Sequence, residues 1–77
     1  MTKHILLMDG PDAKGLIFTV TKVLYENTCN IISQDEFVSP DWQFFMRTEF
    51  EGSDELNPQK VLNDLRQLLP SEEIKLR

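Results

Sequence analysis

Residues 4–27 read HILLMDGPDAKGLIFTVTKVLYEN, and a change of apolar spacing within this stretch decides the fold. His4–Met8 is a short run rich in Ile and Leu, which favours a strand, and the turn-forming residues Gly10 and Pro11 end it. From Leu16 the apolar residues recur every three or four positions, as on one face of a helix. The stretch therefore predicts a strand, a turn and an amphipathic helix in succession.

The first helix is expected to begin at Leu16 and to close at residues 26–28. Asp12 lies just before it and is placed to cap it, because its carboxylate can accept from the free N–H groups of the first turn. The apolar side chains predicted to face the core are Leu16, Ile17, Val20, Val23 and Leu24.

Two extended segments follow, over residues 29–39 and 42–51, and Pro40-Asp41 forms the turn between them. The second segment alternates strictly, with one phase at Phe44, Met46, Thr48 and Phe50 and the other at Phe45, Arg47 and Glu49. The two segments are predicted to pair as an antiparallel hairpin.

A second helix has several independent start signals. Asn57 is expected to cap it, Pro58 to take the first helical position, and Leu56 to pack against Val61. Its predicted buried face consists of Val61, Leu62, Leu65, Leu68 and Leu69. Pro70 should end it, and residues 73–77 are predicted to form a last strand.

The order βαββαβ predicts an α+β, ferredoxin-like sandwich, in which a four-stranded antiparallel sheet carries both helices on one face. We expect one domain over residues 1–77, because chains of this length hold a single core. The face opposite the helices would carry Leu6, Met8 and Phe45, or their alternates, since apolar residues occupy both phases of the first and third strands. We therefore expect something to cover part of that face.

The net charge and the length of the chain indicate which kinds of binding partner to expect. Eight basic against thirteen acidic residues give a net charge of -5, which argues against nucleic acid and anionic membranes. The longest apolar run, Ile5–Met8, is too short for a signal peptide or a membrane span, so we expect a cytoplasmic protein. A chain this short buries only about 60% of the surface that its unfolded form exposes, which favours a homodimer or a higher homo-oligomer.

Few residues offer catalytic chemistry. Cys29 is the only cysteine, so no internal disulfide and no four-ligand zinc site can form around it. His4 is the single histidine and lies in no motif that would give it a catalytic or metal-binding role. Acidic neighbours such as Asp35 and Glu36 diverge and indicate no acid–base couple. We expect no catalytic residue, no metal and no cofactor.

Other activities known for this fold lack their residues. RNA binding needs paired aromatics on one sheet face, whereas Phe44 and Phe45 are adjacent and point to opposite faces. An enzyme that hydrolyses acyl phosphates would need an arginine in the first loop, which offers Lys14 instead, and Asp12 would repel phosphate.

The motif Asp12-Ala13-Lys14-Gly15-Leu16-Ile17, with Asn30-Ile31 opening the next strand, resembles the ACT domain, an amino-acid-sensing module. The resemblance covers essentially the whole chain. It implies that subunits pair side by side and bind a small amino acid where the first loop of one subunit meets the second strand of the other.

Three stretches further resemble the N-terminal domain of the formyltetrahydrofolate deformylase family: Gly10-Pro11-Asp12 with Lys14-Gly15-Leu16-Ile17, DEFV at 35–38 and FFMRTE at 44–49. That family hydrolyses 10-formyltetrahydrofolate to formate and tetrahydrofolate in one-carbon and purine metabolism. Its catalytic work resides in a C-terminal formyltransferase-like domain. The resemblance implies that this chain is a regulatory fragment, not itself an enzyme, whose partner is that catalytic domain.

The ligand site implied by the resemblance joins two chains. The N–H groups near Gly15 and Leu16 would bind the ligand carboxylate, and Asp12 would accept from its ammonium group. Asn30 of the second subunit, with Ile31 beside it, would both donate a hydrogen bond to the ligand and accept one from it. Glycine and methionine are the first candidate ligands. Three alternatives stay open: Asp12, Gly15 and Asn30 serve only as cap, packing and turn residues; the domain only drives oligomerisation; or it is a small stand-alone enzyme.

Overall fold

The computed structural model describes residues 1–11, 14–69 and 75–76. Within them the chain forms β1 (Thr2–Pro11), α1 (Leu16–Glu26), β2 (Asn30–Val38), β3 (Gln43–Gly52), α2 (Pro58–Leu68) and β4 (Lys75–Leu76). The predicted order is confirmed from the first strand to the second helix, and β1 is longer than the segment His4–Met8 that apolar composition alone indicated.

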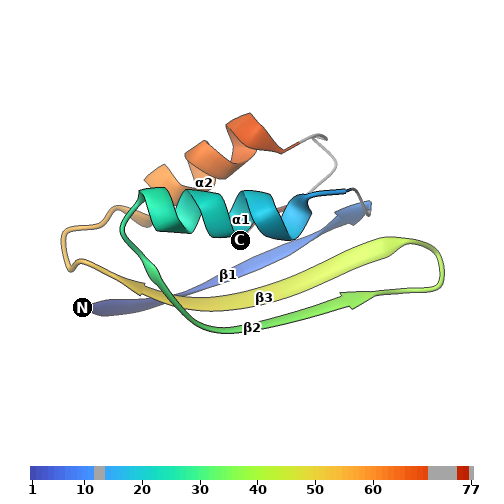
Figure 1. The fold of residues 1–77 in the computed structure, drawn as a ribbon, viewed down its shortest axis with the longest axis horizontal. Helices are drawn as coiled ribbons and strands as arrows, with labels where there is room; N and C mark the ends of the chain where they lie inside the picture. The colour runs from blue at the N-terminus through green and yellow to red at the C-terminus, as the bar shows by residue number, and fades with distance from the viewer. Residues whose placement is uncertain (12–13, 70–74, 77) are drawn as a thin grey trace.

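Three long strands make an antiparallel sheet with β3 between β1 and β2 (Figure 1). β1 pairs with β3 along its whole length, and β2 pairs with the other side of β3, which leaves β2 at the edge of the sheet. The fourth position is represented by the two residues of β4, which pair with Met8 and Asp9. The predicted antiparallel sheet is thus confirmed for three strands, and the rest of the predicted strand 73–77 lies outside the described residues.

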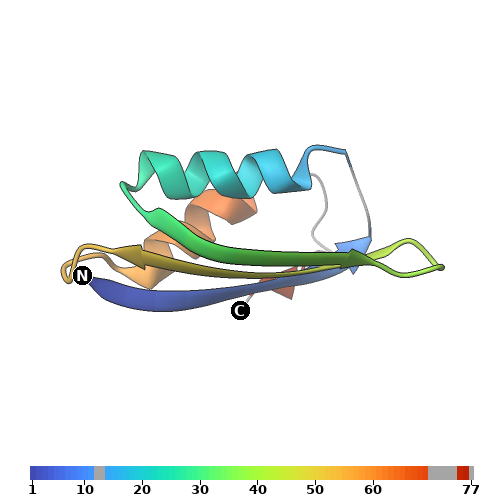
Figure 2. The same cartoon turned by 60° about the horizontal axis from the view of Figure 1, so that its bottom comes forward.

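Both helices lie on the same face of the sheet (Figures 1 and 2). The buried apolar side chains between the two layers are Leu6, Met8, Leu16, Val20, Val23, Leu24, Phe44, Met46, Phe50, Val61 and Leu65. Two predicted core positions are wrong: Ile17 is 39% exposed and Leu68 is 48% exposed. Ile17 lies about 100° around α1 from the buried Leu16, beyond the line that faces the sheet, and Leu68 is the last residue of α2.

The register between β1 and β3 decides which phase of β1 faces the helices. Leu6 and Met8 lie opposite Thr48 and Met46 and are buried beneath the helices. Of the two phases that the sequence left open for β1, the opposite face therefore carries the alternates Ile5 and Leu7, together with Phe45. Because both phases of β1 are apolar, only this long-range register distinguishes them.

The two helices begin differently. The Asn57 side chain accepts a hydrogen bond from the Gln59 N–H at 3.0 Å, with Pro58 directly after it, so this predicted cap is confirmed. At α1 the capping position belongs to Gly15, which makes no side-chain cap bond. Asp12 does not occupy that position, and its own placement lies outside the described residues.

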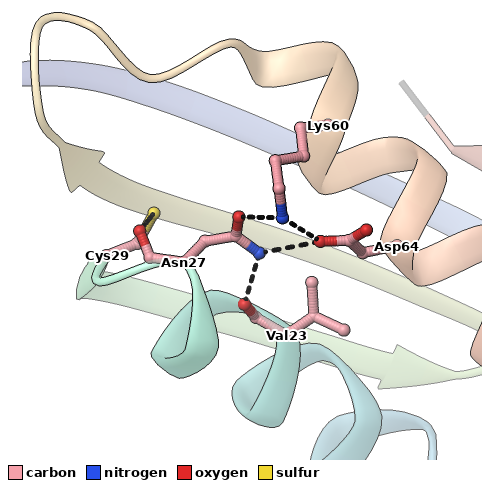
Figure 3. Close-up of polar contacts among 5 residues, drawn as sticks. All are labelled: Val23, Asn27, Cys29, Lys60 and Asp64. Carbon is pink, nitrogen blue, oxygen red and sulfur yellow. Dashed lines mark hydrogen bonds and ion pairs between the residues drawn. The ribbon is translucent and has the colours of Figure 1, made fainter.

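A polar cluster joins the end of α1 to α2 (Figure 3). The Asn27 amide donates to the Val23 carbonyl at 2.9 Å and to the Asp64 carboxylate at 3.1 Å. Lys60 donates to the Asn27 side-chain oxygen at 3.0 Å and forms an ion pair with Asp64 at 2.8 Å. These hydrogen bonds from Lys60 and Asn27 lower the pKa of Asp64. The cluster fixes how the two helices lie against each other.

Candidate functional site

The N-terminus of α1 has the geometry of an anion site. Gly15 has a left-handed backbone, with φ 86°, and a Cβ built there would meet no atom within 4 Å. The first helical hydrogen bond runs from the Thr19 N–H to the Gly15 carbonyl at 2.9 Å. The N–H groups of residues 16–18 therefore precede the helical ladder, and the helix dipole favours negative charge beside them.

A hollow of about 260 Å³ adjoins this helix start. Its walls come from α1, β2 and β3, at Gly15, Leu16, Ile17, Phe18, Glu36, Val38 and Phe44. Glu36 is the acidic side chain of this wall, opposite the donor end of α1. The hollow therefore offers donors for a carboxylate and an acceptor for an ammonium group.

Sequence reasoning missed Glu36 because of an irregularity in β2. Ile31 lies opposite Phe50 and packs on the core, and strict alternation from it would turn Phe37 inward and Glu36 outward. A register shift between Ile31 and Ser33 reverses the alternation after it. The Glu36 side chain therefore lies on the side of the sheet that faces the helices. No local sequence signal marks the shift.

The structure does not bring all the predicted site residues together within one chain. Gly15 and Leu16 lie at the start of α1, whereas Asn30 and Ile31 follow its far end. The helix has 11 residues and so separates the two pairs by about 16 Å. Asn30 is exposed at the first position of β2, as a role toward a second chain requires.

The two other reactive side chains lie elsewhere. Cys29 is partly buried against the core, and this burial raises the pKa of its thiol, which disfavours the reactive thiolate. The ring of His4 stacks on Phe50 with centroids 5.3 Å apart, and its Nε2 is buried with no hydrogen-bond partner among the described residues.

The described ranges also contain no group of three His, Cys, Asp or Glu that could hold a metal. None of their helices is long and apolar enough to cross a membrane.

Comparison with solved structures defines the class of the fold. An ACT domain protein from Streptococcus pneumoniae superposes with a TM-score of 0.77 over 97% of this chain and 84% of its own, at 20% identity. The chain thus has the fold of an ACT domain, as the motif around Gly15 predicts. No family model matches the sequence.

The particular relatives are formyltetrahydrofolate deformylases. The enzyme of Haemophilus influenzae is 46% identical over 71 residues, which cover 91% of this chain and 25% of that protein. The crystal structure of a formyltetrahydrofolate deformylase from Pseudomonas putida superposes with a TM-score of 0.85 over 99% of this chain and 28% of its own, at 23% identity. The chain is therefore a homologue of these deformylases and spans about a quarter of the length of the curated relatives that it matches.

Proposed function

We propose that this chain is the amino-acid-binding and dimerisation domain at the N-terminus of a formyltetrahydrofolate deformylase. The parent enzyme hydrolyses 10-formyltetrahydrofolate to formate and tetrahydrofolate, and residues 1–77 regulate it without contributing a catalytic group. The observation that carries the proposal is the hollow at the start of α1, which residues of the helix N-terminus and Glu36 line together. The sequence identity to deformylases over a quarter of their length supports the parent enzyme.

Dimerisation uses the edge strand β2. One side of this nine-residue strand pairs with β3, and its other side has backbone groups available for a second copy. A twofold antiparallel pairing centred on Gln34 avoids repulsion, because Asp35 then lies across from the partner's Ser33 and not from another carboxylate. The two sheets join edge to edge, with all helices on one side.

This pairing completes the amino-acid site. It lays the Asn30–Ile31 end of one β2 beside the Glu36–Val38 end of its partner, next to Gly15. The helix N–H groups bind the ligand carboxylate, and Glu36 accepts from the ammonium group. Asn30 supplies an amide from the second chain. The small hollow favours a ligand such as glycine or methionine.

A calorimetric titration with glycine and with methionine tests the site. A ligand at a hundredfold excess over its dissociation constant should stabilise the chain by about 2.7 kcal/mol, which a melting curve detects. Glu36→Gln should weaken binding at least about tenfold, because a charged acceptor is lost. The matched control is Glu49→Gln on the opposite face of the sheet, which should leave affinity unchanged.

The alternative is a domain that only assembles subunits, and the open edge of β2 favours this second function equally. A dimer in sedimentation, with no heat and no melting shift for any amino acid, would establish that role and refute amino-acid sensing. Deformylase activity of the 77-residue chain alone would refute the regulatory assignment.

A further inference from the structure

Thr48 is a polar residue in the middle of the apolar core. It lies on β3 between Met46 and Phe50, on the side of the sheet that faces the helices, and its side chain is fully buried. Among the described residues it is the one buried residue with a polar side chain. Valine has nearly the same shape and would bury without the cost of desolvating a hydroxyl, so the hydroxyl itself requires an explanation.

The Thr48 hydroxyl contacts the neighbouring strand β2. Gln34 lies directly opposite Thr48, and Thr48 Oγ1 donates to Gln34 Oε1 at 3.5 Å. Gln34 Nε2 in turn donates to Glu36 Oε2 at 3.3 Å. Gln34 and Glu36 are two residues apart beyond the register shift of β2, so both side chains lie on the helix side. Two hydrogen bonds therefore lead from the core to the carboxylate that lines the hollow beside Gly15.

The chemistry of the three groups permits one orientation of the Gln34 amide. A carboxylate can only accept, so the NH₂ end of the amide must face Glu36. The carbonyl end then faces Thr48, whose hydroxyl donates to it. Both contacts are longer than a strong hydrogen bond, so what they supply is orientation of the side chains more than binding strength.

We propose that Thr48 and Gln34 are positioning residues, which hold the Glu36 carboxylate toward the hollow at the start of α1. The inference rests on the proposed function, in which Glu36 accepts from the ligand ammonium group. Gln34 donates to Oε2 and leaves Oε1 able to accept from the ligand. Glu36 is exposed, so without these contacts its side chain would sample several rotamers. Fixing one rotamer in advance reduces the entropy that binding costs.

Calorimetric titration with glycine and with methionine tests this role on a matched pair of variants. Thr48→Val removes the hydroxyl, keeps the shape of the side chain and should weaken binding about fivefold, as the loss of one neutral hydrogen bond does. This is a weakening and not a loss, so an excess of ligand still fills the site. Thr48→Ser keeps the hydroxyl and should retain most of the affinity. The melting temperature of Thr48→Val should not fall, because a methyl group replaces a buried hydroxyl.

The same substitution in a Glu36→Gln background shows whether the effect passes through Glu36. Thr48→Val should cause no further loss of affinity there, because the carboxylate that it positions is gone. A fivefold loss in both backgrounds would overturn the proposal. So would equal affinity of Thr48→Val and the parent chain, or a loss in Thr48→Ser as large as that in Thr48→Val.

A second measurement needs no ligand. Three-bond NMR couplings should show a preferred χ1 rotamer at Glu36 in the parent chain and averaging in Thr48→Val, while Glu49 on the opposite face behaves alike in both. Averaging at Glu36 in the parent chain, or the same preference in both proteins, would overturn the positioning role whether or not an amino acid binds. A parent chain that shows the preference and binds neither amino acid would refute the proposed ligand site alone and support the positioning of Glu36.

Discussion

At the scale of single residues, Gly15 and Trp42 show two uses of a left-handed backbone. Gly15 lacks a Cβ, so φ 86° costs it little and leaves the helix start open to a ligand. Trp42 adopts φ 64° with a large side chain, and the strain opposes folding. The first residue suits its backbone, whereas the second holds a large, exposed side chain on a backbone conformation that glycine usually adopts.

Trp42→Gly should therefore stabilise the isolated chain, although it deletes the only tryptophan. Relief of the left-handed strain should raise the free energy of unfolding by about 1 kcal/mol, measured by urea denaturation followed by circular dichroism. The control is Glu55→Gly in an exposed loop without a positive φ, which should lower stability through chain entropy. A loss of stability for Trp42→Gly equal to that of the control would refute the assigned strain.

At the scale of elements, the sequence predicts local features well and register poorly. The helix starts, the Asn57 cap and the strict alternation from Phe44 to Phe50 all follow from neighbouring residues, and the structure confirms them. The inward phase of β1 depends on pairing with a strand some forty residues away in sequence. The role of Glu36 depends on the irregularity near Ser33. For the same reason the sequence indicates half of the candidate site, at Gly15 and Leu16, and misses the wall that faces it.

The contact between α1 and α2 makes an element-scale prediction about pH. Because Lys60 and Asn27 lower the pKa of Asp64 below its ordinary 3.8, the folded state binds that proton less readily than the unfolded state. This stabilisation is present above pH 3.8 and is lost as the pH falls through the folded pKa. Melting temperatures measured from pH 7 to pH 2 should therefore show Asp64→Asn destabilised at neutral pH, with the difference shrinking below pH 3.8.

Two lysine variants provide the control for this prediction. Lys60→Met removes the main cause of the low pKa of Asp64 and should weaken the fall of melting temperature at acidic pH. Lys22→Met, at an exposed position on α1, should leave that pH dependence unchanged. A constant difference between Asp64→Asn and the parent chain over the whole pH range would contradict the assignment.

At the scale of the whole molecule, the described part of the sheet has a helix side, an open edge at β2 and a far side. Its helix side holds the core and the hollow beside Gly15, β2 lies at its edge, and its far side exposes Phe37 and Phe45. A chain of 77 residues buries little surface alone, so the additional burial in the proposed dimer should stabilise it. β2 both lines the hollow beside Gly15 and forms an edge of the sheet, so the proposed ligand site and the proposed dimer share this strand.

Disulfide trapping across the β2 edge tests the central claim, that two copies pair there and complete an amino-acid site. Gln34→Cys, in a chain that also carries Cys29→Ala, places the new thiol opposite its own symmetry mate, within the Cα separation of about 4.4–6.8 Å that a disulfide requires. We predict a covalent dimer under mild oxidation that forms faster with glycine or methionine present, while Thr21→Cys on α1 in the same background stays monomeric on a denaturing gel. Equal and slow cross-linking of both variants, with no effect of either amino acid, would contradict the account.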